Sequence, residues 1–397
     1  MANRIGGPLH GITVLDLSAY IAGPYCCTLL ADLGADVIKV EPPGGDTIRQ
    51  YPSTLESESR AFLGVNRSKQ GIVIDLKNSQ GLGVLKRLVA RADVLVHNFR
   101  PSVPGRLGVG YDALKAIKPD LIYCTLSGYG ETGPLAEKAG YDQVLQSITG
   151  ICAFQGQGKA EPEIVYGSVV DFYAAALLSN AVCAALYHRA RTGQGQSLDV
   201  SLLGASLAMQ STRFVWADGE PREIGRDMRS GGVTGIHPCA RGTYLYLSAN
   251  TPHFWEALCR LIGEPRLSEN PDYRTVRQRA GKAQEIVPKL RAALQKRTAQ
   301  QWEELFGDDV PCGAVRPIED MFDYPQALEQ GYVARLNHPR LGGYRGFAGA
   351  FKFGALDTPK PFGAPEKGQH TRMVLDTHGF SADEIAHLFQ CGAIKGN

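Results

Sequence analysis

The sequence predicts an α/β fold with a Rossmann-like large domain and a smaller second domain. Short apolar runs rich in β-branched residues alternate with helical segments over the first 130 residues, and the character of the chain changes near residue 218. Apolar strands separated by helices are typical of a parallel sheet that is covered on both faces. A chain of 397 residues is also expected to form two domains, because a single core stops growing at roughly 250–300 residues.

The elements of the large domain follow one another in a regular order. Gly34 ends the first helix and Gly193 follows the third, as expected where a chain leaves a helix with a positive φ. The third helix begins with Asp171, an acid that can accept hydrogen bonds from free N–H groups. We predict strands at residues 12–17, 37–40, 72–76, 94–96, 121–126 and 198–200, and helices at 22–33, 81–92, 171–191 and 202–215.

A glycine- and arginine-rich link through Gly235 separates the large domain from a smaller one. Between residues 242 and 312 the sequence predicts a strand at 244–247 and several charged amphipathic helices. The tail from residue 336 is rich in Gly, Pro and Lys and has little periodicity until residues 382–388. We therefore expect a large domain over residues 1–220 and 330–397, and a small domain with its linkers over residues 221–329.

Composition and charge exclude several classes of protein. Lys and Arg total 42 against 40 Asp and Glu, so nothing in the charge balance indicates nucleic-acid binding. No apolar run approaches the roughly 20 residues that span a bilayer, and the first nine residues do not read as a secretory signal. The nine cysteines form no CxxC pair, which favours reduced thiols in a cytoplasmic protein and no metal site.

The glycine pattern at residues 128–133 fits GxGxxG, the fingerprint of dinucleotide sites. A true fingerprint opens a helix in the first βαβ unit and is followed about 20 residues later by an acid. Here it comes after several strands, Pro134 follows it, and residues 148–155 hold no acid. A glycine-rich turn that lines another kind of pocket is therefore favoured over an NAD site. The sequence has no P-loop and no GxSxG motif.

A series of short blocks between residues 7 and 196 carries the functional signal. They include Gly128-Tyr129-Gly130, and the others lie at residues 7–17, 22–24, 30–44, 45–49, 66–69, 74–77, 92–101, 106–108, 140–142 and 192–196. In this order they resemble the class III CoA-transferases, the family that includes formyl-CoA transferase and carnitine CoA-transferase. The resemblance is dense from residue 7 to about 210 and thinner beyond, where His237-Pro238 is the clearest anchor.

The resemblance implies an acyl-CoA:carboxylate CoA-transferase with Asp171 as its nucleophile. From position alone, Asp171 is a helix cap; the resemblance adds the catalytic role. A carboxylate needs no deprotonation at neutral pH and can attack the thioester of a donor such as succinyl-CoA. A mixed anhydride and then an aspartyl-CoA thioester follow, and the acceptor acid reverses the steps. CoA is a substrate here, and no permanently bound cofactor is implied.

The resemblance also implies residues that bind CoA. Lys77 and Arg106 suit its phosphates, and Phe99 could pack beside the adenine. Arg49 and Arg100 match basic positions of the family. Gly231 and Gly232 correspond to a mobile loop that supplies oxyanion donors, although a flexible linker explains them equally well. The complete set of CoA contacts implied by the resemblance is Ala19, Ile21, Ile74, Lys77, Asn98, Phe99 and Arg106.

Tyr141 and Asp142 separate this chain from related acyl-CoA racemases. Those enzymes have a His-Asp pair there and use the histidine for α-proton exchange, for which a tyrosine with its high pKa is a poor substitute. Ala19 and Ile21 replace a His and a Gln of formyl-CoA transferase, so oxalate is a doubtful acceptor. A racemase of the same fold and an inactive CoA-binding homologue remain the alternatives.

The resemblance finally implies an interlocked homodimer, in which each chain threads around the other. The weakly patterned stretch at residues 336–369 suits a tail that wraps a partner. The expected partners are therefore a second copy of the chain, an acyl-CoA and a carboxylic acid, with no nucleic acid and no membrane.

Overall fold

The computed structural model describes residues 6–155, 161–221 and 233–396. The chain divides into two compact units, one formed by Met1–Phe214 with Pro325–Asn397 and the other by Val215–Tyr324. The sequence analysis placed the two boundaries at 220/221 and 329/330.

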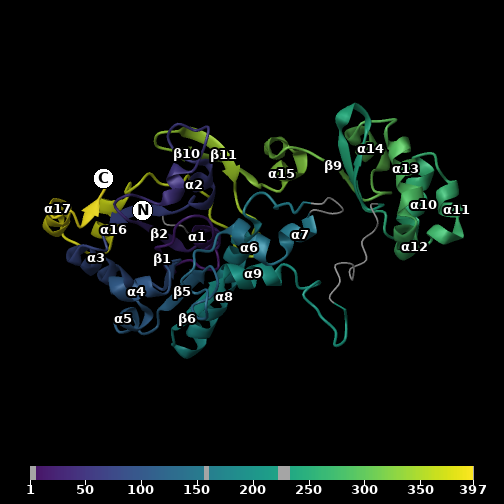
Figure 1. The fold of residues 1–397 in the computed structure, drawn as a ribbon. Coiled ribbons are helices and arrows are strands. Elements are labelled where there is room, and N and C mark those ends of the chain that lie inside the picture. The colour runs from purple at the N-terminus through teal and green to yellow at the C-terminus, as the bar shows by residue number, and fades with distance from the viewer. Residues whose placement is uncertain (1–5, 156–160, 222–232, 397) are drawn as a thin grey trace. The chain divides into compact units, whose positions relative to one another are not determined.

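The large unit is built around a seven-stranded sheet with the order β12-β3-β2-β1-β4-β5-β6. Figure 1 labels β1, β2, β5 and β6 of this sheet. The prediction of a parallel sheet is confirmed for six strands, and only β12 runs antiparallel, against β3. The order 3-2-1-4-5-6 is that of the Rossmann fold. The strands are β1 (Thr13–Asp16), β2 (Asp36–Glu41), β3 (Gln70–Ile74), β4 (Val94–His97), β5 (Ile122–Ser127), β6 (Gln196–Ser201) and β12 (Ile394–Lys395).

Helices cover both faces of this sheet, as the apolar strands predict. Side chains alternate between the faces along each strand: Val14 of β1 joins the core on one face and Leu15 the core on the other. One core includes α1 (Ala22–Asp32), α6 (Asp142–Ile148), α7 (Ile151–Gln155), α8 (Val169–Thr192) and α9 (Leu202–Ala208). The other includes α3 (Ser79–Val89), α4 (Ser102–Leu107), α5 (Tyr111–Lys115), α16 (Thr371–Thr377) and α17 (Ala382–Gln390).

Helix α8 differs from the prediction in where it begins. It starts at Val169, so Asp171 is its third residue and not its cap; Ser168 holds the N-cap position. Gly193 ends the helix with φ 74° as expected. By length and composition α8 could cross a membrane, against the expectation that no segment could, but its buried residues pack in the core of the large unit. Helix α9 ends at Ala208 rather than near residue 215.

The tail contains more structure than its sequence predicted. Strands β10 (Val333–His338) and β11 (Gly342–Phe347) form an antiparallel hairpin. Helix α15 (Pro325–Glu329) lies before this hairpin. After the hairpin the tail returns to the large sheet, where the His370 N–H donates to the Gly71 carbonyl.

Near the start of the chain, a short 3₁₀ helix at Thr47–Gln50 is followed by α2 (Arg60–Val65).

The small unit has its own sheet and core. Strands β7 (Gly235–Pro238), β8 (Tyr244–Leu247) and β9 (Cys312–Ala314) are antiparallel, and β8 lies where predicted. Trp255, Trp302 and Phe306 are its largest buried apolar side chains. The helices are α10 (Pro252–Leu261), α11 (Arg266–Glu269), α12 (Val276–Gly281), α13 (Ala283–Leu294) and α14 (Ala299–Phe306), with 3₁₀ turns at Ala240–Gly242, Pro271–Tyr273 and Ile318–Phe322.

Candidate active site

The site lies at the carboxyl ends of β1 and β4, where the strand order reverses. In open α/β sheets this crevice is the usual place for a ligand. Asn98, just after β4, holds the chain just after β1: its Oδ1 accepts from the Ala19 N–H at 2.9 Å, and its Nδ2 donates to the Ala19 carbonyl at 2.8 Å. This double hydrogen bond fixes the floor of the crevice.

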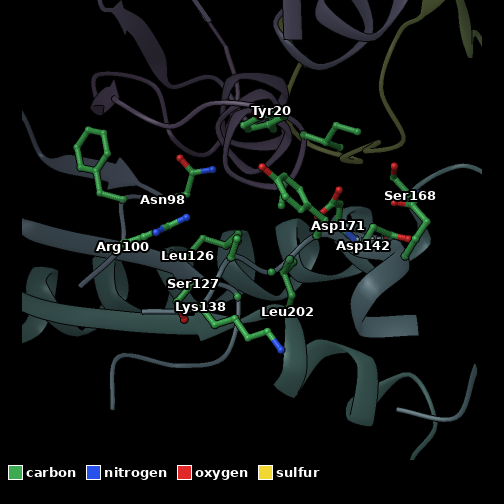
Figure 2. A pocket seen from close by; sticks show the side chains of 18 of the residues that line it. Tyr20, Asn98, Arg100, Leu126, Ser127, Lys138, Asp142, Ser168, Asp171 and Leu202 are labelled. Atoms are coloured by element: carbon green, nitrogen blue, oxygen red, sulfur yellow. Dashed lines mark hydrogen bonds between the residues drawn. The ribbon is translucent and has the colours of Figure 1, made fainter. Parts of the chain in front are cut away.

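Two cavities of about 490 Å³ each open from this crevice, and Phe99 lines both. Asp171, Tyr141 and Asp142 line the first cavity, and Figure 2 labels Asp171 and Asp142 there. The second is formed by the turn at residues 42–47 together with the ends of β1 and β3. One extended ligand could therefore pass from the second cavity to the first along Phe99.

The residues implied to bind CoA divide between the two cavities, with one exception. Ile21, Asn98 and Phe99 line the first, while Ala19, Ile74, Lys77 and Phe99 line the second. Arg106 lines neither; it is exposed on α4 beside Leu107, which does line the second cavity. Gly231 and Gly232 lie outside the described residues.

A buried ion pair that the sequence analysis missed supports the wall between the cavities. The Lys39 ammonium lies 2.8 Å from Asp46 Oδ2 and also donates to the Ser18 carbonyl. Asp46 Oδ1 in turn accepts from the Tyr20 N–H at 3.1 Å. Tyr20 has φ 67°, a conformation that a residue with a Cβ adopts only when its surroundings hold it there. The signal in the sequence was Lys39 itself, a charge inside an apolar strand.

A second buried pair continues this network beneath the site. The Lys69 ammonium contacts Asp16 Oδ2 at 2.8 Å, and Lys39 lies 3.9 Å from the same oxygen. All three side chains are fully buried. Burial opposes ionisation of Asp16, but the charges of Lys39 and Lys69 hold its pKa below the ordinary value. The carboxyl end of β1, from which the chain continues into the walls of both cavities, is thus stabilised by the ion pairs of Asp16 with the two lysines.

Arg49 is part of the framework rather than of a cavity wall. Its guanidinium makes two contacts with Glu41, at 2.7 and 2.8 Å, and a further ion pair with Glu58. It also stacks on the ring of Phe62, 3.5 Å from the ring centre. With its donors occupied in this way, Arg49 ties β2 to the segment that precedes α2.

Asp171 lies in the first turn of α8, partly buried and facing the first cavity. The Asp142 carboxylate lies beside it and accepts from the N–H of Asp171 at 3.1 Å (Figure 2). A close backbone contact brings Asp142 there: a Cβ on Gly128 would lie 2.9 Å from the Cα of Gly140. Because neither Gly128 nor Gly140 has a Cβ, the end of β5 and the segment before α6 can approach this closely.

Burial, and secondly the nearby charge of Asp142, raise the pKa of Asp171 from 3.8 to about 7. The expectation that this carboxyl needs no deprotonation at neutral pH therefore needs correction, because a pKa raised to about 7 leaves part of it protonated there.

Aromatic and basic side chains complete the first cavity. The rings of Tyr20 and Tyr141 meet edge to face, with centres 5.7 Å apart. Arg100 and Lys138 line the same cavity and supply positive charge at its wall. Over residues 6–155, 161–221 and 233–396, no group of three or more His, Cys, Asp or Glu side chains is placed to hold a metal ion.

Comparisons with known proteins show what this chain is similar to as a whole. The family model described as CoA-transferase family III matches residues 9–371. Succinyl-CoA:glutarate CoA-transferase of Mus musculus is 32% identical over 98% of this chain and 90% of the relative. Succinyl-CoA--D-citramalate CoA-transferase of Chloroflexus aurantiacus is 31% identical over 96% of each. A CAIB/BAIF family protein from Brucella suis has a similar solved structure, with a TM-score of 0.81 and 29% identity over 94% of this chain and 100% of that one.

Proposed function

Since the chain belongs to CoA-transferase family III and is an acyl-CoA:carboxylate CoA-transferase, we propose that it transfers CoA through a covalent intermediate on Asp171. The observation that carries this proposal is the position of Asp171. Two carboxylates line the first cavity. Asp142 is buried and accepts hydrogen bonds from the backbone of α8, whereas Asp171 is only partly buried, lies in the first turn of α8 and has a raised pKa. Perturbed acids in a cleft are candidates for catalysis.

CoA is proposed to occupy both cavities. Its adenine and phosphates lie in the second cavity near Lys77, and its arm passes Phe99 and brings the thioester into the first. The two cavities share Phe99, which supports this path. The apolar residues Ile21 and Leu126 at the first cavity help to keep water from the reactive carbonyl.

The reaction is proposed to proceed by exchange of acyl bonds. An Asp171 oxygen attacks the donor thioester carbonyl, and the C–S bond breaks to give a mixed anhydride and CoA thiolate. The thiolate attacks the Asp171 carbonyl, releasing the first acid and forming the aspartyl-CoA thioester. The acceptor carboxylate then attacks this thioester, and the thiolate attacks the acceptor carbonyl of the new anhydride. This last step regenerates Asp171 and yields the new acyl-CoA.

Transfer is expected to depend on pH through Asp171. Only the carboxylate form is a nucleophile, and the free protein holds the pKa of Asp171 at about 7. The value of kcat/KM should therefore rise about tenfold per pH unit below pH 6 and level off above pH 8. Initial rates from pH 5 to 9 at low substrate concentration measure this; a flat profile down to pH 5 would contradict a raised pKa.

The acceptor is proposed to be a dicarboxylic acid, and the donor is proposed to be the CoA thioester of another dicarboxylic acid, succinyl-CoA. The relatives named for succinyl-CoA with glutarate and with D-citramalate support this choice. Arg100 and Lys138 provide charge for a second carboxylate at the wall of the first cavity. Succinyl-CoA should be tested with glutarate and with pentanoate, the five-carbon monocarboxylate. Faster transfer to glutarate, reduced by Arg100→Ala, is expected; equal rates would count against the proposal.

Lys77 and Arg106 are proposed to contact CoA phosphates. Alanine at either position should weaken CoA binding roughly fivefold at low ionic strength, because each loses an exposed charge pair of about 1 kcal/mol. The loss should shrink in high salt. Titration calorimetry measures both affinities, with exposed Lys115 of α5 replaced by alanine as the control. Unchanged binding in Arg106→Ala would remove this residue from the phosphate site.

The interlocked homodimer and a cytoplasmic location are further proposals. Exposed apolar side chains on the tail support a partner there, among them Phe351, Phe353 and Leu356. No membrane association or nucleic-acid partner is proposed. Mass measurement in solution across protein concentrations tests the dimer, which should persist at nanomolar concentration if the chains are interlocked.

A further inference from the structure

We infer that Asp142 is a positioning residue that caps α8 from the neighbouring helix α6, and thereby fixes both the orientation of Asp171 and the electrostatic field in which it reacts. This inference rests on the proposed role of Asp171 as nucleophile. Asp142 would therefore act on the position of Asp171 and not by contact with substrate. Its side chain connects the N-terminal end of α8, the segment before α8 and the Asp171 carboxyl.

Helix α8 needs a cap from outside its own sequence. The N-cap residue of a helix normally has extended backbone and accepts from the second or third N–H of the helix. Ser168 instead has φ 57° and follows Gly167 with φ 102°, and its hydroxyl makes no capping hydrogen bond. Asp142 Oδ2 replaces it, accepting from the N–H groups of Val170 at 2.6 Å and Asp171 at 3.1 Å.

Gln146 holds Asp142 in place. It lies one turn further along α6 and donates from Nε2 to Asp142 Oδ1. The same amide pairs with the backbone of Val165, accepting from its N–H at 2.8 Å and donating to its carbonyl at 2.9 Å. Asp142 is 2% exposed and Gln146 is fully buried. One pair of side chains therefore anchors both the segment before α8 and the helix end itself.

This arrangement changes what the helix end offers to Asp171. The N–H groups that could have stabilised its carboxylate already donate to Asp142. Asp142 also places a second negative charge near the Asp171 carboxylate. Arg100 and Lys138 at the cavity wall oppose this charge. The other ionisable groups that line the cavity are the phenols of Tyr20, Tyr51 and Tyr141. A less stabilised carboxylate is more basic, and a more basic carboxylate is the stronger nucleophile.

The test compares Asp142→Asn with the unchanged chain. The amide oxygen can still accept from α8, but the charge is removed, so the pKa of Asp171 should fall. Brief mixing with succinyl-CoA, acid quenching and peptide mass mapping give the rate of CoA addition to Asp171 at each pH. In Asp142→Asn, the pH at which this rate reaches half its high-pH value is expected to fall by at least half a unit, and the rate at high pH is expected to be slower. An unchanged midpoint pH overturns the inference.

Gln146→Leu provides a second test that does not depend on removing a buried charge. It keeps the charge of Asp142 but removes the hydrogen bond that orients it and the two hydrogen bonds to the Val165 backbone. The rate on the high-pH plateau should therefore fall about tenfold, while the pH midpoint of the rate and the CoA affinity stay unchanged. A plateau equal to that of the unchanged chain overturns the inference. Ser147→Ala, an exposed change on the same helix, is the control. If the unchanged chain forms no adduct with any donor, the proposed function itself has failed instead.

Discussion

Replacing Asp171 with asparagine is expected to reduce CoA transfer by at least a thousandfold. The amide keeps the size of the side chain but cannot form the anhydride or the thioester, so the remaining rate comes only from binding and orientation. The change should leave CoA affinity largely intact, because Asp171 does not line the second cavity, where the adenine and phosphates are proposed to bind. Steady-state rates and calorimetric titration measure the two effects separately.

The same variant should be more stable than the unchanged chain at pH 8. Burial and Asp142 raise the pKa of Asp171 above its unfolded value of 3.8. Its ionisation therefore destabilises the fold as pH rises from 4 through 7. Asparagine removes this cost, which is on the order of 4 kcal/mol above pH 7, because each unit of pKa difference is worth about 1.4 kcal/mol. Thermal unfolding at pH 5 and pH 8 measures it, and no gain at pH 8 would show that Asp171 ionises freely.

Asp199→Asn is the matched control for the activity experiment. Burial also raises the pKa of Asp199, but this residue lines neither cavity. It should keep its transfer activity. Full activity in Asp171→Asn, with mass spectrometry excluding deamidation to aspartate, would contradict the proposed mechanism.

Replacing Asp16 with leucine is expected to destabilise the protein by roughly 3–5 kcal/mol, because it leaves the buried ammonium groups of Lys39 and Lys69 without their shared partner. Asp16 contacts Lys69 at 2.8 Å, and all three side chains are fully buried. CoA binding should weaken as well, since Ser18 and Tyr20 at the cavity walls depend on the same network.

Urea denaturation measures this effect, with an exposed ion pair as control. Arg260 lies 3.2 Å from Asp309 and both side chains are more than 60% exposed. Arg260→Ala should cost less than 1 kcal/mol. A loss below 1 kcal/mol for Asp16→Leu would show that the lysines find other partners or lose their protons.

The regular part of the fold could be predicted because it follows from local pattern. Each apolar run between residues 12 and 126 becomes a strand of the large sheet, since only burial on both faces explains such runs. The hairpin of β10 and β11 escaped prediction because β11 consists largely of glycine and exposed side chains, and only Leu336 and His338 are buried on β10. Its register depends on pairing, which periodicity does not reveal.

The site was predicted by resemblance rather than by pattern. Position alone made Asp171 a helix cap, whereas the structure gives the capping task to Asp142, a residue 29 positions earlier. No local rule links the two, because the contact depends on the close approach of Gly128 and Gly140. The buried lysines were missed for a similar reason: their partners come from other strands and turns.

The most direct test of the account is the mass of the protein after brief mixing with succinyl-CoA and a pool of other acyl-CoAs. The account predicts a CoA adduct on the peptide that contains Asp171, absent in Asp171→Asn and removed when an acceptor acid is added. An adduct on a different residue, or none with any donor in protein that still binds CoA, would contradict it.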